Sequence, residues 1–177
     1  MIRIINILLL LGLVLAEYKA VDELNLNYYV GEWQEVYGNN FDKIFQGNGR
    51  CIKAFYKLNE KNISVLNTEF DSKDNLDSIT GYAFYKDNDY GGYLTVQLEG
   101  QSDAPYWVIE LGPIVNNLYD YAIVSDNLRL SLFVLARNVT EFFDKYNESV
   151  GISLKKFGFD NIINKPYEIN QDNCSKN

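Results

Sequence analysis

The chain has no histidine, only two cysteines and only three prolines among its 177 residues. Most hydrolytic triads, most zinc sites and histidine-ligated haem need an imidazole, so we expect no catalytic residue, no metal site and no cofactor. Basic residues are also scarce, since 16 Lys and Arg oppose 24 Asp and Glu and leave a formal net charge of −8. This charge repels polyanions at long range, which argues against nucleic acid as a partner.

Long apolar runs are missing as well, apart from one near the N-terminus. Arg3 precedes a run from Ile4 to Ala16, which is shorter than the roughly 20 apolar residues that a membrane-spanning helix needs. A basic start, an apolar stretch of this size and a small-residue exit are typical of a secretory signal peptide. We therefore predict a signal peptide over residues 1–16 and one secreted domain over residues 17–177, with no stable membrane insertion.

The two cysteines agree with export from the cell. In a secreted chain they allow one intramolecular disulfide, Cys51 with Cys174, and the alternative is two buried free thiols. Such a bridge would join the C-terminal tail to the body of the domain and would stabilise the fold by about 4–5 kcal/mol.

Aromatic residues are abundant, with 14 Tyr and 10 Phe, and they fall in short segments with β-branched residues. Clusters of Gly, Asn and Asp separate these segments, and this pattern is typical of a sandwich or barrel. The predicted strands are roughly 30–38, 49–58, 62–71, 79–86, 92–99, 105–112, 119–126 and 129–137. Eight sequential strands favour an all-β fold, an antiparallel up-and-down barrel that encloses packed side chains or one small ligand.

After the strands the apolar period changes to three and four residues, which predicts one α-helix packed on the barrel wall. The residues of its apolar face are Phe142, Phe143, Tyr146, Val150, Leu154 and Phe157. Asn138 with Glu141 resembles a capping box at the helix start, and Gly158 stands where a helix commonly ends.

Several segments resemble the lipocalin family in their order along the chain. The first predicted strand contains Gly31-Glu32-Trp33, which is similar to the first lipocalin signature. Other matching segments are 48–52, 104–107, 121–124 and 135–138. Within the family they resemble the apolipoprotein D type. One departure lies at 116–118, where the second family signature, Thr-Asp-Tyr, is replaced.

The resemblance implies a barrel closed at one end by Gly31, Trp33 and Arg137. Trp33 would plug that end, and the guanidinium of Arg137 would lie across its indole. A cation over a Trp face contributes about 0.5–2 kcal/mol and leaves no unpaired charge at the seal. The alternative is a simple core Trp33 with an exposed Arg137.

Strand alternation separates inward from outward side chains. If Cys51 faces outward to reach the tail, then Ile52, Ala54, Tyr56 and Leu58 face inward. The predicted ligand-binding residues are Ala54, Tyr56, Asn67, Val96, Leu98, Phe133 and Leu135. Tyr56 and Asn67 would orient a polar group of the ligand.

The predicted function is extracellular binding and transport of a small hydrophobic ligand such as a lipid, sterol or retinoid, by a monomer or weak oligomer. Phe133 stands where the apolipoprotein D type has a Trp, and Asp71 stands where it has an Arg near the mouth. An anion at the entrance weakens the attraction for fatty-acid carboxylates, so a neutral lipid is favoured. Aromatic side chains that fill a solid barrel are the alternative.

Two other classes of function stay open at this point. Carboxylates such as Glu35, Glu69 and Glu99 would serve a barrel enzyme if they pair inside the barrel for acid and base chemistry. An exposed apolar patch at Ile44-Phe45 in the first long loop would serve a lipocalin that binds another protein.

Four Asn-x-Ser/Thr sequons are candidate glycosylation sites, at Asn62, Asn138, Asn147 and Asn173. Asn173 shares its sequon with the bridging Cys174, and Asn138 is the predicted helix cap. Asn62 and Asn147 are therefore favoured.

Overall fold

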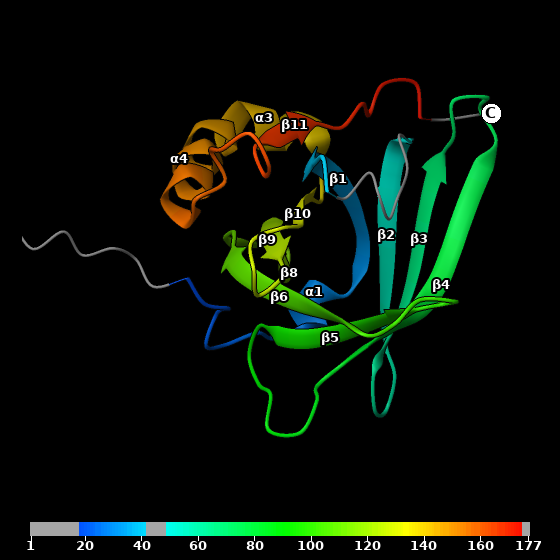
Figure 1. The fold of residues 1–177 in the computed structure, drawn as a ribbon, viewed down its shortest axis with the longest axis vertical. Coiled ribbons are helices and arrows are strands. Elements are labelled where there is room, and N and C mark those ends of the chain that lie inside the picture. Colours follow the sequence, from blue (N-terminus) through cyan, green and yellow to red (C-terminus); the bar gives the residue numbers. More distant parts are fainter. Residues whose placement is uncertain (1–17, 42–48, 175–177) are drawn as a thin grey trace, which may run out of the picture.

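Antiparallel strands close into a β-barrel in the computed structural model (Figure 1). The structure describes residues 18–41 and 49–174. The predicted signal peptide at 1–16 and the loop dipeptide Ile44-Phe45 lie outside the described residues.

Eight strands form the wall of the barrel. They are β1 (Gly31–Asn39), β2 (Arg50–Leu58), β3 (Ile63–Phe70), β4 (Leu76–Phe84), β5 (Tyr93–Leu98), β6 (Ala104–Leu111), β9 (Tyr121–Ser125) and β10 (Leu132–Ala136). Each pairs with the next strand of the wall, and β10 closes the barrel on β1. The predicted eight-stranded up-and-down barrel is confirmed.

The other elements lie at the ends and on the outside of the barrel. They are α1 (Leu26–Tyr29), β7 (Ile114–Val115), β8 (Leu118–Tyr119), α3 (Val139–Lys145), α4 (Asn147–Phe157) and β11 (Pro166–Glu168). Because the wall strands alternate in direction, the loops after β3, β5 and β9 gather at one end, which we call the open end. The hairpins after β2 and β4 lie at the opposite, closed end, together with α1.

The core has two parts, one on each side of the barrel wall. Alternate side chains of β9 face opposite sides of the strand, and both sides are covered, so every residue of β9 is buried. Ala122 and Val124 pack inside the barrel, whereas Tyr121 and Ile123 pack outside it among residues of α3 and α4. These two helices lie together on one side of the barrel (Figure 1).

The helical segment differs from the prediction in one respect, since it forms two helices and not one. The side-chain oxygen of Asn138 accepts a hydrogen bond from the Glu141 backbone at 3.0 Å, and Gly158 ends α4 with φ at +88°. Between them, Tyr146 has φ at −117° and its ring packs 5.1 Å from that of Tyr121. Both helices present their apolar faces to the same wall, so the apolar period continues across the break.

Two strand boundaries were also wrong, because carboxylates hold the turns before them. Asp71 accepts hydrogen bonds from the backbones of Lys73 and Asn75, so the turn is tight and β4 begins at 76 and not at 79. Asp126 accepts from the backbones of three residues of the next turn, and β10 begins at 132 and not at 129.

The C-terminal tail runs between the open-end halves of β1 and β2. β11 pairs with the last residues of β1, whereas β2 pairs only with the first residues of β1. Farther along, the Gln171 side chain donates to the backbone carbonyls of Glu35 at 2.7 Å and Ile52 at 3.0 Å. The predicted disulfide between Cys51 and Cys174 is confirmed, and it fixes the tail in this position.

Candidate ligand cavity

The closed end of the barrel is built around Trp33, which is fully buried. Its indole nitrogen donates a hydrogen bond to the carbonyl of Tyr29 at 2.7 Å. The guanidinium carbon of Arg137 lies 3.5 Å from the centre of the indole ring. Tyr29 comes from α1, Trp33 from β1 and Arg137 directly follows β10, so three separate segments meet at this seal.

Arg137 binds the backbone as well as the indole. Its guanidinium donates to the carbonyls of Tyr28, Tyr29, Val30, Glu32 and Tyr119. Burial lowers the pKa of Arg137 to about 10, so the group remains charged at neutral pH. Gly31 has φ at +102°, and a Cβ there would lie 3.3 Å from Arg137, which favours glycine at this position.

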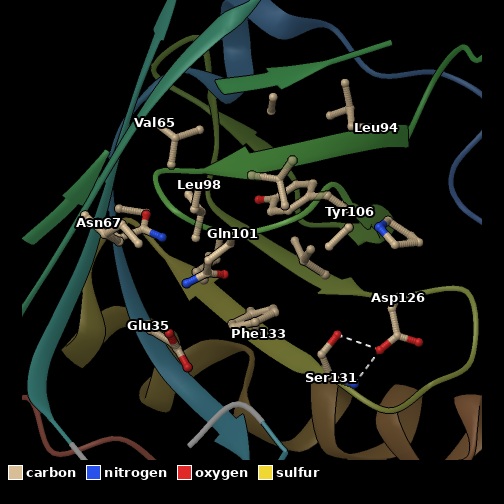
Figure 2. A pocket seen from close by; sticks show the side chains of 18 of the residues that line it. Glu35, Val65, Asn67, Leu94, Leu98, Gln101, Tyr106, Asp126, Ser131 and Phe133 are labelled. Atoms are coloured by element: carbon tan, nitrogen blue, oxygen red, sulfur yellow. Dashed lines mark hydrogen bonds between the residues drawn. The ribbon is translucent and has the colours of Figure 1, made fainter. Parts of the chain in front are cut away.

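Above the seal the barrel contains a cavity of about 730 Å³, within the range of small-molecule sites. All seven predicted ligand-binding residues line it, namely Ala54, Tyr56, Asn67, Val96, Leu98, Phe133 and Leu135. Figure 2 shows Asn67, Leu98 and Phe133 directed into the cavity from β3, β5 and β10. The aromatic side chains therefore do not fill the barrel.

The predicted alternation of inward and outward side chains along β2 is only partly correct. Cys51 has φ at +56° and the pairing of β2 with β3 shifts between Arg50 and Lys53, so Cys51 and Ile52 are both buried. Ile52 lines the cavity as predicted. The inward prediction for Leu58 was wrong: its side chain is 40% exposed, because β2 runs on past the closed end to its hairpin.

Two tyrosines that the sequence did not single out lie beside Tyr56. The hydroxyl of Tyr106 is 2.6 Å from that of Tyr29 and 3.0 Å from that of Tyr56. The rings of Tyr29 and Tyr56 stack with their centres 5.7 Å apart. Burial raises the pKa of Tyr56 to about 12 and holds the pKa values of the other two well above the ordinary value, so all three phenols are neutral at pH 7.

The charged groups of the lining are mostly carboxylates. They belong to Glu35, Glu69, Asp77, Asp103 and Asp126. Lys53 is the one cation among the described lining residues, and its ammonium group binds Glu32 at 2.6 Å. Burial, followed by the neighbouring Asp77 and Asp71, raises the pKa of Glu69. The lining is thus rich in negative charge.

Two of the carboxylates considered from sequence lie elsewhere. Asp71 is not part of the lining, but its side chain holds the turn between β3 and β4 at the open end, near the mouth as expected. Glu99 lies outside the cavity and accepts a hydrogen bond from Thr80. Glu35 and Glu69 do line the cavity, so two of the three acids considered for a barrel enzyme face the same space.

The four sequons have different surroundings. Asn62 lies in the hairpin between β2 and β3, and its side-chain oxygen accepts from Asn59 at 2.8 Å. Asn138 caps α3, and Asn147 accepts a hydrogen bond from the hydroxyl of Tyr37 at 2.8 Å. Asn173 is exposed, with φ at +55° beside the disulfide.

A barrel with one sealed end, one open end and an internal cavity is the architecture of a small-molecule carrier. The model of the Lipocalin-like domain matches residues 24–162, and the chain belongs to the lipocalin family. The chain is 32% identical to the outer membrane lipoprotein Blc of Vibrio cholerae over 147 residues, which is 80% of this chain and 81% of that protein.

A second relative is similar in sequence, and a solved structure is similar in fold. The Lazarillo protein of Schistocerca americana is 28% identical over 97 residues, 53% of this chain and 45% of that protein. Insecticyanin from the tobacco hornworm Manduca sexta has a similar fold, with a TM-score of 0.64 at 17% identity over 87% of this chain and 84% of that chain. The resemblance to the apolipoprotein D type stays a prediction.

Two features bear on where the protein works. The disulfide is typical of compartments outside the reducing cytosol. None of the helices described for residues 18–41 and 49–174 is long and apolar enough to cross a membrane.

Proposed function

We propose that this lipocalin binds one small, uncharged, hydrophobic molecule inside the barrel and carries it outside the cell. The observation that carries the proposal is the cavity of about 730 Å³, sealed at one end by Trp33 and Arg137. The resemblance to the apolipoprotein D type points in the same direction.

The driving force in this proposal is desolvation. The cavity wall is mainly aliphatic and aromatic, with Val96, Leu98, Phe133 and Leu135 among its residues. Each Å² of apolar ligand surface that leaves water for such a wall contributes about 25 cal/mol. A lipid or sterol that fits the cavity is therefore held without a covalent bond or a charged anchor.

The charge of the lining selects against anions. Glu69 and Asp77 belong to the cavity wall, and the single described lysine of the wall is paired with Glu32. A fatty-acid carboxylate meets repulsion there and finds no free cation among the described lining residues. Neutral lipids, sterols and retinoids meet no such cost.

A dye-displacement titration tests the proposal. The neutral dye Nile red is bound to the purified protein, and cholesterol, retinol and stearate are added in separate titrations. We expect the two neutral ligands to displace the dye at lower concentration than stearate does. If none of the three displaces it, the carrier function is overturned.

Two matched leucine substitutions test whether the ligand binds inside the cavity. Leu98→Trp fills part of the cavity and should weaken displacement by retinol at least tenfold. Leu66→Trp adds the same bulk at a position that is 37% exposed and outside the cavity, and it should change nothing. Equal binding by both folded variants would place the ligand elsewhere.

Secretion in soluble form is the location that this proposal favours. The apolar run ending at Ala16 and the disulfide support it. A membrane-anchored form is the alternative, because one relative is named an outer membrane lipoprotein. N-terminal sequencing of protein from the medium should give Glu17 first, whereas recovery only from detergent-extracted membranes contradicts secretion.

Glycosylation is proposed at Asn62. The side-chain oxygens of Asn138 and Asn147 accept hydrogen bonds from the α3 backbone and from Tyr37, and Asn173 adjoins the disulfide, whereas the oxygen of Asn62 accepts from Asn59 within its own hairpin. Expression in a glycosylating host should give a glycan mass that Asn62→Gln removes.

A further inference from the structure

The hydroxyls of three cavity-lining tyrosines meet near the closed end of the barrel. Tyr29 comes from α1, Tyr56 from β2 and Tyr106 from β6. The Tyr106 hydroxyl lies between the other two, at 2.6 Å from Tyr29 and 3.0 Å from Tyr56. All three residues line the cavity, and their hydroxyls form one polar cluster. We call these three residues the tyrosine triad.

The tyrosine triad has one more hydroxyl proton than it has hydrogen bonds between its members. Three neutral phenols carry three hydroxyl protons, and the two contacts between them use two. If Tyr106 donates to Tyr29, the proton of Tyr29 is left, and if it donates to Tyr56, the proton of Tyr56 is left. If both neighbours donate to Tyr106, its own proton is left. The described residues supply no acceptor for that third proton in any of the three arrangements.

The triad is held in place by the seal below it. Trp33 and Arg137 both donate hydrogen bonds to the carbonyl of Tyr29, at 2.7 and 3.0 Å. The stacked rings of Tyr29 and Tyr56 and the edge contact of Tyr56 with Tyr106 fix the other two phenols. Because these contacts all lie within the protein itself, the donor is held in place by its neighbours and an incoming group loses little ordering entropy.

A hydroxyl donor that has no acceptor among the described residues gains a hydrogen bond when a ligand oxygen reaches it. We propose that the ligand enters polar end first and that its terminal carbonyl or hydroxyl oxygen accepts the spare proton of the tyrosine triad. This inference rests on the proposed carrier function and narrows its ligand class to neutral molecules with a terminal oxygen. The apolar body of the ligand then lies along Leu98 and Phe133 toward the open end.

The test uses two matched ligands, tridecan-2-one and tridecane, which compete with Nile red for the protein. The ketone accepts a hydrogen bond but cannot donate one, so it reports on the spare proton alone. We expect the ketone to bind about tenfold more tightly than the alkane, although the alkane is the more hydrophobic of the two. Equal binding overturns this inference and leaves the carrier function standing. If neither ligand displaces the dye, this inference is overturned, and the titrations with cholesterol, retinol and stearate decide the carrier function separately.

A triple variant identifies the donor. Phenylalanine at Tyr29, Tyr56 and Tyr106 removes all three hydroxyls together, and an apolar replacement of every partner in a buried network is often nearly neutral for folding. This variant should bind ketone and alkane equally. The control variant carries phenylalanine at three tyrosines outside the cavity whose hydroxyls are hydrogen-bonded. They are Tyr18, Tyr37 and Tyr121.

The control should keep the wild-type preference for the ketone, and a preference that survives in the triad variant overturns the assignment. The infrared carbonyl stretch of the bound ketone gives a second readout that needs no variant. In the wild-type protein we expect the band at lower wavenumber than in hexane, and an unshifted band contradicts the inference even where the triple variant does not fold.

Discussion

The guanidinium of Arg137 lies over the indole of Trp33, with 3.5 Å between its central carbon and the ring centre. The same group donates to five backbone carbonyls, so one side chain ties α1, β1 and the segment before β9 together. This contact closes the barrel below the cavity.

Arg137→Lys should lower the free energy of unfolding by about 2–4 kcal/mol. Lysine keeps the charge but lacks the planar fork, so several buried carbonyls lose their donor. Urea denaturation followed by tryptophan fluorescence measures this difference. Lys53→Gln removes a partly exposed cation of the wall outside the seal and should cost less than about 1 kcal/mol. A similar cost for both variants would contradict the role of the seal.

Removal of the disulfide by the double variant Cys51→Ala, Cys174→Ala should destabilise the fold by about 4–5 kcal/mol. The bridge closes a segment with a sequence separation of 123 residues, and an open chain gains that much conformational freedom on unfolding. Hydrogen exchange at the backbone of Ile169, which bonds Val36, should become faster as the tail leaves its place. Unchanged exchange there would show that β11 holds the tail alone.

Neutralising the lining should admit anions. Glu69→Gln and Asp77→Asn together should strengthen binding of the anionic dye ANS about three- to tenfold. Binding of Nile red should not change, because Nile red is uncharged whereas ANS is an anion. The double variant Glu148→Gln, Asp144→Asn removes the same charge from the exposed sides of the helices and serves as the control. An equal gain in the control would indicate net charge as the cause.

Stability should fall at alkaline pH because of Tyr56. Its pKa is raised from 10.0 to about 12 in the folded protein, so folding favours the neutral phenol. The stabilisation is fully present below pH 10 and is lost between pH 10 and 12, by about 2–3 kcal/mol in total. Urea unfolding at pH 8, 10 and 11 should show a smaller pH dependence in Tyr56→Phe than in wild type. The exposed Tyr82→Phe should keep the wild-type dependence.

Strand alternation and the family pattern predict part of the cavity lining from the sequence alone. Asn67, Val96 and Phe133 lie on strands with regular pairing, where every second side chain faces inward. Leu58 failed the same rule because alternation does not tell where a strand leaves the barrel. Cys51 departs from strand alternation because of a backbone bulge, which the neighbouring residues in the sequence do not predict.

The features that sequence reasoning missed depend on tertiary contacts. Tyr29 precedes the first strand in a four-residue helix, which has no apolar period to read. Tyr106 lies within a predicted strand, but only the fold brings its hydroxyl to Tyr29 and Tyr56. β11 has three residues, too few for a strand pattern, so the insertion of the tail between β1 and β2 was not foreseen.

The most direct test of the central claim is native mass spectrometry of the protein mixed with equal amounts of retinol and stearate. We predict a one-to-one complex with retinol that is lost in Leu98→Trp and kept in Leu66→Trp. A complex with stearate alone, or a retinol complex that survives in Leu98→Trp, would contradict a neutral ligand inside the barrel.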